Sequence, residues 1–373
     1  MSSGIRCAVR GALTALILIE GISQVGAQVS NNNQSWTTSS QLTDASGTVN
    51  PTRSTTTHSE VDGRMIEKTV VEALGPDGRY IPYSEIERES VRVNETTVRN
   101  VERSYGRTPD GQRVLTQETR EDSRSLPDRE RRVTRTTSNP DGNGALQVVQ
   151  RALIDSKQVS PGVEETKTTL FSADGSGGLA PTVKIEERES KMDATTIEFR
   201  KSTSLADGTG RWNLSEVREG TTRQQAGGTT KEERVLRPGA NGKMAVVERT
   251  VSKHSVGGAD TTETYSTNVP GQAGNEALQL VRRESSAQRT SASGARTTTR
   301  RVEQTNPGDP GAGLHVTQEA IDIVRPGANG TAAQTGTTLA SDSNGHLNTV
   351  WIDMGHTDNP AKVDTAAAKK PSQ

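Results

Sequence analysis

Turn signals rich in glycine recur along almost the whole chain at a nearly constant spacing. Successive signals lie about 31–33 residues apart up to Gly271 and slightly farther apart beyond it. They are Asp44–Gly47, Pro76–Gly78, Pro109–Gly111, Pro140–Gly144, Asp174–Gly177, Asp207–Gly210, Gly239–Gly242, Gly271–Gly274, Pro310–Gly313 and Ser343–Gly345. Self-similarity at a fixed period is typical of repeat architectures, so ten signals predict about nine tandem units between them.

The segments between the turns show the periodicity of strands. After a turn, two apolar residues stand two positions apart and a charged stretch follows, as in Val183/Ile185, Trp212/Leu214, Met244/Val246 and Leu278/Leu280. Residues i and i+2 of a strand face the same side, so these pairs predict one buried face. A spacing of two, rather than three or four, argues against helices.

Each unit is therefore predicted to be a strand, a loop, a second strand and an Asp-Gly or Gly-x-x-Gly turn. Such turns are strong hairpin signals because glycine adopts positive φ without strain. Paired threonines such as Thr195-Thr196 and Thr261-Thr262, whose β-branched side chains suit strands, often open the second half of a unit. We predict an all-β chain of tandem hairpin repeats of about 33 residues, with about 18 strands in an extended or curled antiparallel sheet. A propeller, an outer-membrane barrel and a largely disordered chain are the alternatives.

Composition limits how such units can be stabilised. Hydrophobic residues make up 29% of the chain and aromatic residues 2%, which is too little for a large compact core. The net charge is −1, so charge repulsion does not hold the chain open. We expect neighbouring units to cover one another. Balanced charge also argues against nucleic acid as a partner, because counterion release requires a basic face.

The N-terminus has the pattern of a secretory signal peptide. Arg6 and Arg10 precede the apolar run Ala12–Ile19, and a small-residue exit follows at Val25–Ala27. We predict a signal peptide over residues 1–27, a flexible leader over 28–43, the repeat array over 44–356 and a disordered tail over 357–373. The mature chain is expected to lie in the periplasm or outside the cell, without a transmembrane helix.

The residues offer no recognisable site for chemistry. Cys7 would leave with the signal peptide, so the mature chain would contain no cysteine. The histidines are scattered, at His58, His254, His315, His346 and His356. The Asp-Gly-x-Gly turns carry only one acidic residue each, and Asn139–Gly144 is the turn richest in oxygen ligands, whereas calcium takes six to eight of them. We therefore predict no catalytic residue, no cofactor-binding residue and no metal ligand, and no cofactor.

The sequence favours an exported protein with a structural or binding role, whose partner is a protein or glycan of the cell envelope or the extracellular space. It is not predicted to be an enzyme. One alternative is a secreted hydrolase that uses carboxylates on the sheet face, and another is an outer-membrane barrel. The charged segment Arg129–Arg132 is interpreted as a solvated strand face, with a polyanion-binding stripe as the sharper alternative.

Overall fold

The structure is a computed structural model of the 373-residue chain. It describes residues 34–43, 49–61, 63–267, 277–306, 309–327, 332–342 and 345–358. The predicted signal peptide, residues 28–33 of the predicted leader, and the tail beyond residue 358 lie outside the described residues. No helix long and apolar enough to cross a membrane occurs in the described part of the chain.

The described residues form twenty strands and one short 3-10 turn. The first ten strands are β1 (Gln34–Thr43), β2 (Val49–Val61), β3 (Arg64–Leu74), β4 (Tyr80–Arg92), β5 (Thr97–Arg107), β6 (Arg113–Ser125), β7 (Arg131–Pro140), β8 (Leu146–Ser160), β9 (Val163–Ala173) and β10 (Leu179–Lys191). The other ten are β11 (Thr196–Ala206), β12 (Trp212–Gln225), β13 (Gly228–Pro238), β14 (Met244–Ser255), β15 (Ala259–Ser266), β16 (Gln279–Thr290), β17 (Arg296–Asn306), β18 (Asp309–Pro326), β19 (Ala332–Ser341) and β20 (Leu347–Asp358). The 3-10 turn η1 is Pro127–Arg129.

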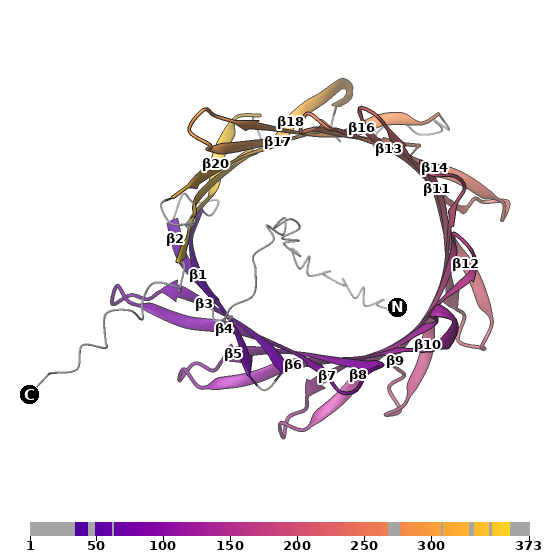
Figure 1. Cartoon of the computed structure of the whole chain (residues 1–373), viewed down its shortest axis with the longest axis horizontal. Helices are drawn as coiled ribbons and strands as arrows, with labels where there is room; N and C mark the ends of the chain where they lie inside the picture. Colours follow the sequence, from indigo (N-terminus) through magenta and orange to yellow (C-terminus); the bar gives the residue numbers. More distant parts are fainter. Residues whose placement is uncertain are drawn as a thin grey trace, which may run out of the picture. The chain divides into compact units, whose positions relative to one another are not determined.

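Consecutive strands pair antiparallel from β1 to β20, and β20 pairs antiparallel with β1, from Ser35↔Asp358 to Leu42↔Trp351. The strands are therefore arranged around a closed ring (Figure 1). The all-β antiparallel prediction is confirmed. The prediction of an open, extended or curled sheet is wrong, because the sheet closes into a twenty-stranded barrel. This architecture fits the outer-membrane barrel, one of the alternatives drawn from the sequence, better than the open array.

Closure uses two half-units that the repeat count leaves out. Ten turns enclose nine units, but strand β1 precedes the first turn and strand β20 follows the last one. Residues 34–43, predicted to belong to a flexible leader, are instead strand β1, because they find pairing partners in both β2 and β20. Twenty is an even number, which a ring of antiparallel neighbours requires.

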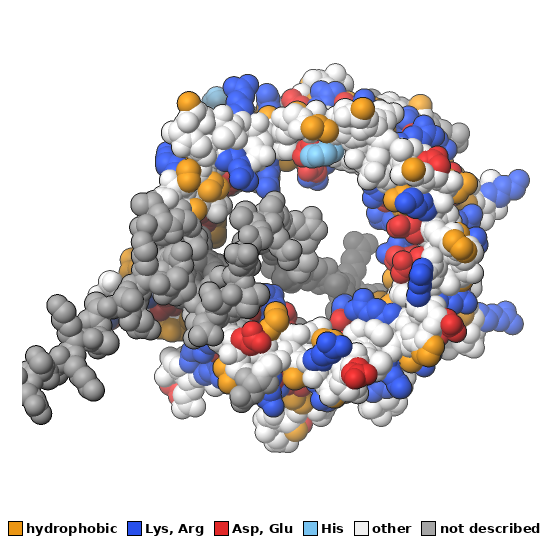
Figure 2. Space-filling model, viewed as in Figure 1, with side chains coloured by type: hydrophobic (Ala, Val, Ile, Leu, Met, Phe, Trp, Pro, Cys, Tyr) orange, Lys and Arg blue, Asp and Glu red, His pale blue; other side chains and the backbone are white. Residues whose placement is uncertain are grey.

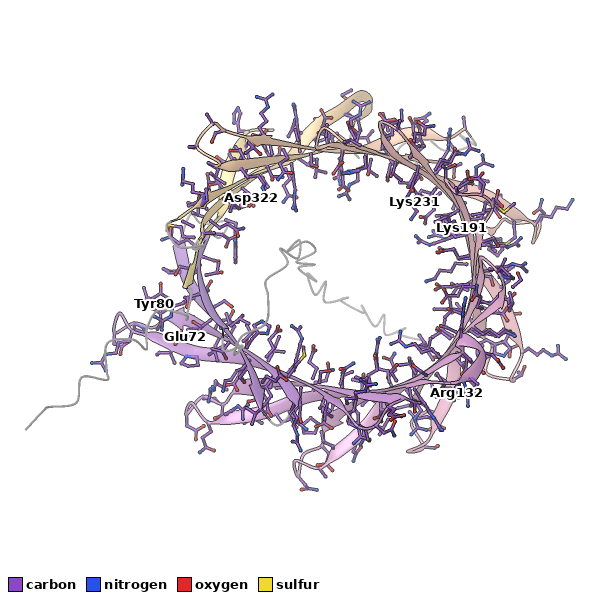
Figure 3. The ribbon with its side chains drawn as sticks, viewed as in Figure 1. Glu72, Tyr80, Arg132, Lys191, Lys231 and Asp322 are labelled. Atoms are coloured by element: carbon purple, nitrogen blue, oxygen red, sulfur yellow. The ribbon has the colours of Figure 1, made fainter. Side chains whose placement is uncertain are left out.

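The register divides the side chains of the wall between two faces. Followed from strand to strand, it places Glu72, Tyr80 and Arg132 on one face and Lys231 and Asp322 on the other. In Figure 3 the first three residues lie on the outside of the ring and the last two toward its inside. We call these the outer face and the inner face.

Nine strands, the even-numbered ones from β4 to β20, each carry a β-bulge close to a repeated turn, and the sequence analysis missed these bulges. Register shifts leave one unpaired residue in each of nine strands: Tyr83, Thr116, Val149, Thr182, Ser215, Val247, Val281, Thr317 and Val350. Where the bulge residue is Ser or Thr, its hydroxyl donates a hydrogen bond across the ladder, as from Thr116 to the carbonyl of Ser104 (2.9 Å) and from Ser215 to that of Thr203 (3.0 Å). Except for Tyr83, the bulge residue is a valine, threonine or serine at a nearly constant place after the turn, and this was the available signal.

The bulges determine which face of the wall each apolar pair occupies. Trp212 and Leu214 lie before the bulge of β12 and share the outer face, whereas Val183 and Ile185 lie beyond the bulge of β10 and share the inner face. The pairs therefore do not form the single buried face that the sequence predicts, and that prediction is wrong. Trp212 remains 37% exposed and Leu214 42% exposed.

The wall contains little buried apolar material. Among the described residues, the buried hydrophobic side chains are those of Val101, Val133, Ala152, Val217 and Val235. Charged side chains of both signs mix with apolar ones around the ring (Figure 2). The backbone ladder and cross-strand side-chain pairs must therefore supply much of the stability.

The glycines of the repeated turns adopt the conformation that the sequence predicts for hairpins. Gly78 has φ +77° and Gly111 has φ +83°. The predicted turns Asp44–Gly47 and Gly271–Gly274 lie outside the described residues. Residues Pro310–Gly313 do not form the expected turn, because they lie within strand β18, where the register with β17 shifts.

Candidate binding surface on the outer wall

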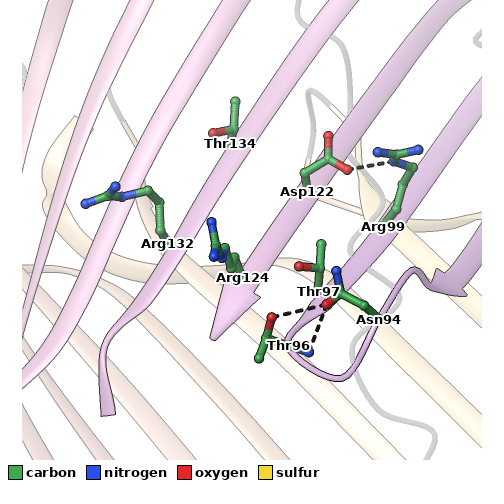
Figure 4. A pocket seen from close by; sticks show the side chains of 8 residues that line it. All are labelled: Asn94, Thr96, Thr97, Arg99, Asp122, Arg124, Arg132 and Thr134. Carbon is green, nitrogen blue, oxygen red and sulfur yellow. Dashed lines mark hydrogen bonds and ion pairs between the residues drawn. The ribbon is translucent and has the colours of Figure 1, made fainter. Parts of the chain in front are cut away.

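Two adjoining pockets on the outer face of strands β3–β7 form the candidate site, and we call them together the basic groove. The first, of about 480 Å³, is lined by Asn94, Thr96, Thr97, Arg99, Asp122, Arg124, Arg132 and Thr134 (Figure 4). The second, of about 290 Å³, is lined by Arg64, Glu89, Val91, Arg99, Val101, Arg103, Glu118 and Arg120. Six arginines and three carboxylates line the groove, in a chain whose net charge is −1.

Strand alternation explains why these residues converge. Arg99 of β5 stands opposite Asp122 of β6, and Arg124 of β6 stands opposite both Thr97 of β5 and Arg132 of β7. Residues directly opposite in register share one face, so this stretch of wall carries every second residue of three strands. The loop before β5 closes the end of the first pocket, where Asn94 Oδ1 accepts hydrogen bonds from the backbone N–H (3.0 Å) and hydroxyl (3.1 Å) of Thr96.

Most arginines of the groove have a carboxylate partner. Arg99 Nε lies 2.6 Å from Asp122 Oδ1, and Arg120 Nε lies 3.0 Å from Asp122 Oδ2. Arg103 Nε lies 2.8 Å from Glu118 Oε2. Burial alone would raise the pKa of Asp122, but hydrogen bonds from Arg99 and Arg120 hold it below its usual value. The carboxylate therefore stays charged, and its two arginines are held in place.

Arg124 differs from the other arginines of the groove. Among the described residues it has no ion-pair partner, although it lines the first pocket. Its cross-strand neighbour Arg132 pairs away from the pocket, with Asp155 at 2.6 Å and Glu130 at 3.9 Å. The first pocket thus presents a guanidinium group that no carboxylate of the described wall neutralises.

A second cluster, next to the groove, is centred on a buried carboxylate. Glu85 of β4 is only 3% exposed and lies 2.8 Å from Lys68 Nζ, 2.6 Å from Arg113 Nη2 and 3.6 Å from Arg107 Nη2. Burial alone would raise the pKa of Glu85, but the hydrogen bond and charge of Lys68 and the charge of Arg113 lower it on balance. Glu85 is thus a structural counter-ion for three cations.

A secreted hydrolase, one of the alternatives drawn from the sequence, would use a carboxyl group of the wall as a general acid. A general acid of this kind needs a pKa raised toward neutrality. In all ten described carboxyl groups whose pKa is shifted, the shift is downward. Hydrogen bonds from arginines, lysines, hydroxyls or turn N–H groups are the common cause of these lowered pKa values.

The turn aspartates are occupied by their own backbone. Asp141 Oδ1 accepts hydrogen bonds from the N–H groups of Asn143 (2.8 Å) and Ala145 (2.9 Å), and Asp207 Oδ1 accepts from those of Thr209 (2.8 Å) and Arg211 (3.2 Å). The N–H groups of Asn143 and Ala145 lower the pKa of Asp141, and the Thr209 hydroxyl (2.7 Å) together with the N–H groups lowers that of Asp207. Among the residues that the structure describes, no three His, Cys, Asp or Glu side chains gather closely enough to hold a metal ion.

The histidines named from the sequence are not brought together. His58 lies in β2 with its Nε2 3.1 Å from Glu67, and His254 lies in β14 beside Asp260. His315 lies in β18, and His346 precedes β20 with Nδ1 3.9 Å from Asp342. His356 belongs to β20, but its side chain lies outside the described residues.

The predicted charged segment contributes one residue to the groove. Arg129 ends η1, and Arg131 and Arg132 open strand β7 on opposite faces. Only Arg132 of these three lines the first pocket. The sequence thus indicates the right neighbourhood for a basic surface, but not the strands β5 and β6 that complete it.

Comparison with known proteins identifies no family. No protein-family model matches the chain, and no curated protein matches it. Among solved structures, the siderophore receptor PirA of Acinetobacter baumannii has 7% identity and a TM-score of 0.47 over 89% of this chain and 81% of that chain. The alcaligin outer-membrane receptor FauA of Bordetella pertussis has 7% identity and a TM-score of 0.45, over 89% of this chain and 77% of that chain. OccK5 (OpdH) of Pseudomonas aeruginosa has 10% identity and a TM-score of 0.41, over 87% and 96%.

Proposed function

We propose that this chain is an exported barrel of the cell envelope that acts as a binding scaffold through its charged outer wall, without catalysis. The basic groove is the surface on which we expect a polar partner to bind. The signal-like N-terminus supports export, and the lowered carboxyl pKa values favour a binding role over hydrolysis.

The observation that carries this proposal is the presence of charge at mid-strand on both faces of the wall. Glu87 of β4 stands opposite Arg103 of β5 on the outer face, and the next pair along the strands, Arg88 and Glu102, occupies the inner face. A lysine or arginine on the lipid face at the bilayer midplane costs about 2–4 kcal/mol. A wall charged on both faces is suited to water on both sides.

An outer-membrane barrel is the second candidate, and two observations favour it. The sheet closes with an even number of antiparallel strands, as in bacterial outer-membrane barrels. Exposed apolar pairs also line the outer face next to the repeated turns, as with Leu146/Val148 and Trp212/Leu214. Each pair extends only about 7 Å along its strand, whereas a lipid-facing band is about 25 Å tall.

Fractionation of cells that express the chain with its N-terminus intact distinguishes the two candidates. For a water-bathed scaffold, we expect the barrel in the periplasmic or extracellular fraction, or released from membranes by urea and high salt. Retention in the washed membrane pellet, with release only by detergent, would favour the outer-membrane barrel. A chain that stays in the cytoplasm would contradict both.

A further inference from the structure

Arginines stand directly opposite each other at four places in the described strands. The four pairs are Arg107/Arg113, Arg124/Arg132, Arg188/Arg200 and Arg234/Arg249. Like charges directly opposite in a sheet destabilise the pairing. A nearby negative group that neutralises both positive charges therefore stabilises such a pair.

Two of the pairs share a bridging carboxylate from the chain itself. Glu85 lies 2.6 Å from Arg113 and 3.6 Å from Arg107. Glu232 lies 3.2 Å from Arg234 and 3.0 Å from Arg249. In both cases one carboxylate contacts both guanidinium groups. A carboxylate is thus the group with which this wall stabilises two opposed arginines.

The Arg124/Arg132 pair has no such bridge. Asp155 and Glu130 neutralise Arg132 alone, and among the described residues Arg124 has no carboxylate partner. In the Arg188/Arg200 pair Arg188 contacts Glu165 at 3.6 Å, and neither arginine lines the basic groove. Arg124 thus stands opposite another arginine with no shared carboxylate between them, and it also lines the first pocket.

We propose that the first pocket is a subsite for the acidic group of a saccharide, with the guanidinium of Arg124 binding the oxyanion in place of the missing carboxylate. The planar guanidinium group matches an oxyanion through two parallel hydrogen bonds. The inference rests on the proposed binding role and specifies its ligand class. Arg99 and Arg132 also line the pocket, but Asp122 pairs with the first and Asp155 with the second, so Arg124 supplies the unneutralised charge.

The rest of the pocket fits a sugar better than a bare ion. Thr97 and Thr134 add hydroxyl groups beside the arginines, and these can donate to or accept from sugar hydroxyls. A volume of about 480 Å³ lies within the range of ordinary ligand pockets, about 300–1,000 Å³, and exceeds what one inorganic anion fills.

Calorimetric titration of the purified mature chain with glucuronate tests the subsite. Glucose, inorganic sulfate and inorganic phosphate are titrated in parallel at constant ionic strength. We expect saturable binding of glucuronate and none of glucose. Arg124→Gln should weaken glucuronate binding at least tenfold, since a charge-assisted, two-bond contact is lost. Arg124→Lys keeps the positive charge without the planar guanidinium group. Its affinity for glucuronate should therefore lie between that of the unmodified chain and that of Arg124→Gln.

Arg223→Gln is the matched control. Arg223 also lies on the outer face, opposite Thr196 and Thr230, but it has no arginine across from it. It should bind glucuronate as the unmodified chain does. Circular dichroism melts of all variants show whether each remains folded.

Equal binding by the Arg124→Gln variant, or an equal loss in the Arg223→Gln variant, would overturn the proposal. Binding of sulfate or phosphate through Arg124 without glucuronate would overturn the assignment to a sugar carboxylate. Cytoplasmic retention in the fractionation experiment would count against the envelope role while leaving an Arg124-dependent glucuronate titration intact, so the two failures can be told apart.

Discussion

The wall around strands β3–β7 and the seam where β20 meets β1 have the same backbone pairing but different side-chain chemistry. The first region contains Glu85 with its three cations and the ion pairs of Arg99 and Arg103. In the seam, strands β1 and β19 contain no charged residue, and Ser40 hydrogen-bonds to Asp353. Thr56 of the neighbouring β2 is buried and pairs with the Thr69 hydroxyl at 2.9 Å.

The difference shows that one barrel wall can be held together in two ways. In the charged region most cations lie beside carboxylates, so the stability of this region depends on the protonation of those carboxylates. The seam depends mainly on main-chain hydrogen bonds and hydroxyl contacts, and its strands β1 and β19 contribute no charged side chain. A change in the number of strands would also disrupt pairing at the seam, because the two ends of the sheet meet there.

The largest expected effect comes from changing the number of strands. Truncation after Ser341 removes β20 and leaves nineteen strands, so β1 and β19 would run parallel and could not form the antiparallel closure. Two unpaired edges then promote association with other chains. We expect loss of the monomer on size-exclusion chromatography and loss of a cooperative melt.

Deletion of a whole hairpin is the control for that truncation. Removing residues 332–358 takes out both β19 and β20, leaves eighteen strands and lets β18 face β1 in antiparallel orientation. This variant should retain more monomer than the nineteen-stranded one, although it has lost more strands. Equal behaviour of the two variants would show that closure at the seam does not govern assembly.

A smaller effect is expected from Glu85→Gln in the charged region. The change removes the negative charge that compensates Lys68, Arg107 and Arg113. Because Lys68 is 42% exposed and Arg113 35% exposed, water screens part of the loss, and we expect destabilisation of about 1–3 kcal/mol. Urea denaturation at pH 7 measures it, with Glu95→Gln in the exposed β4–β5 turn as control.

The same variant has a predicted pH dependence. The pKa of Glu85 lies below its ordinary value of 4.5 in the folded chain, so its contribution is fully present above about pH 4.5 and is lost as pH falls through the folded pKa. The difference in unfolding free energy between the unmodified chain and Glu85→Gln should therefore shrink in acid. A difference that stays constant down to about pH 2 would indicate that charge is not its cause.

The smallest effect is expected from replacing a turn glycine by alanine, and it should be similar in the two regions. Gly111 follows β5 in the charged region and Gly345 precedes β20 at the seam, and both have φ +83° with open space around the position of a Cβ. Alanine at either position costs about 1–2 kcal/mol for its backbone conformation alone. Thermal melts of Gly111→Ala and Gly345→Ala should fall by similar amounts. A clear inequality would mean that the turns differ between the regions as well as the walls.

Much of the strand and turn pattern could be predicted because it depends on local chemistry. Alternation and Asp-Gly turns identify hairpins with no reference to distant residues, and the positive φ of Gly78 follows from its place in the turn. The faces of Trp212 and Val183 could not be predicted, because a bulge of one residue reverses which side of the wall the following residues occupy. The basic groove was missed for the same reason, since it depends on register across three strands.

The amino-acid sequence by itself determined an antiparallel chain of polar strands, with balanced charge and little apolar material to bury. Only the tertiary structure decided that the strands close into a barrel. Closure joins residues 35–42 to residues 351–358, more than three hundred positions away. No local pattern records that contact, because the pairing of β1 with β20 depends on the number of strands and on the register accumulated around the whole ring.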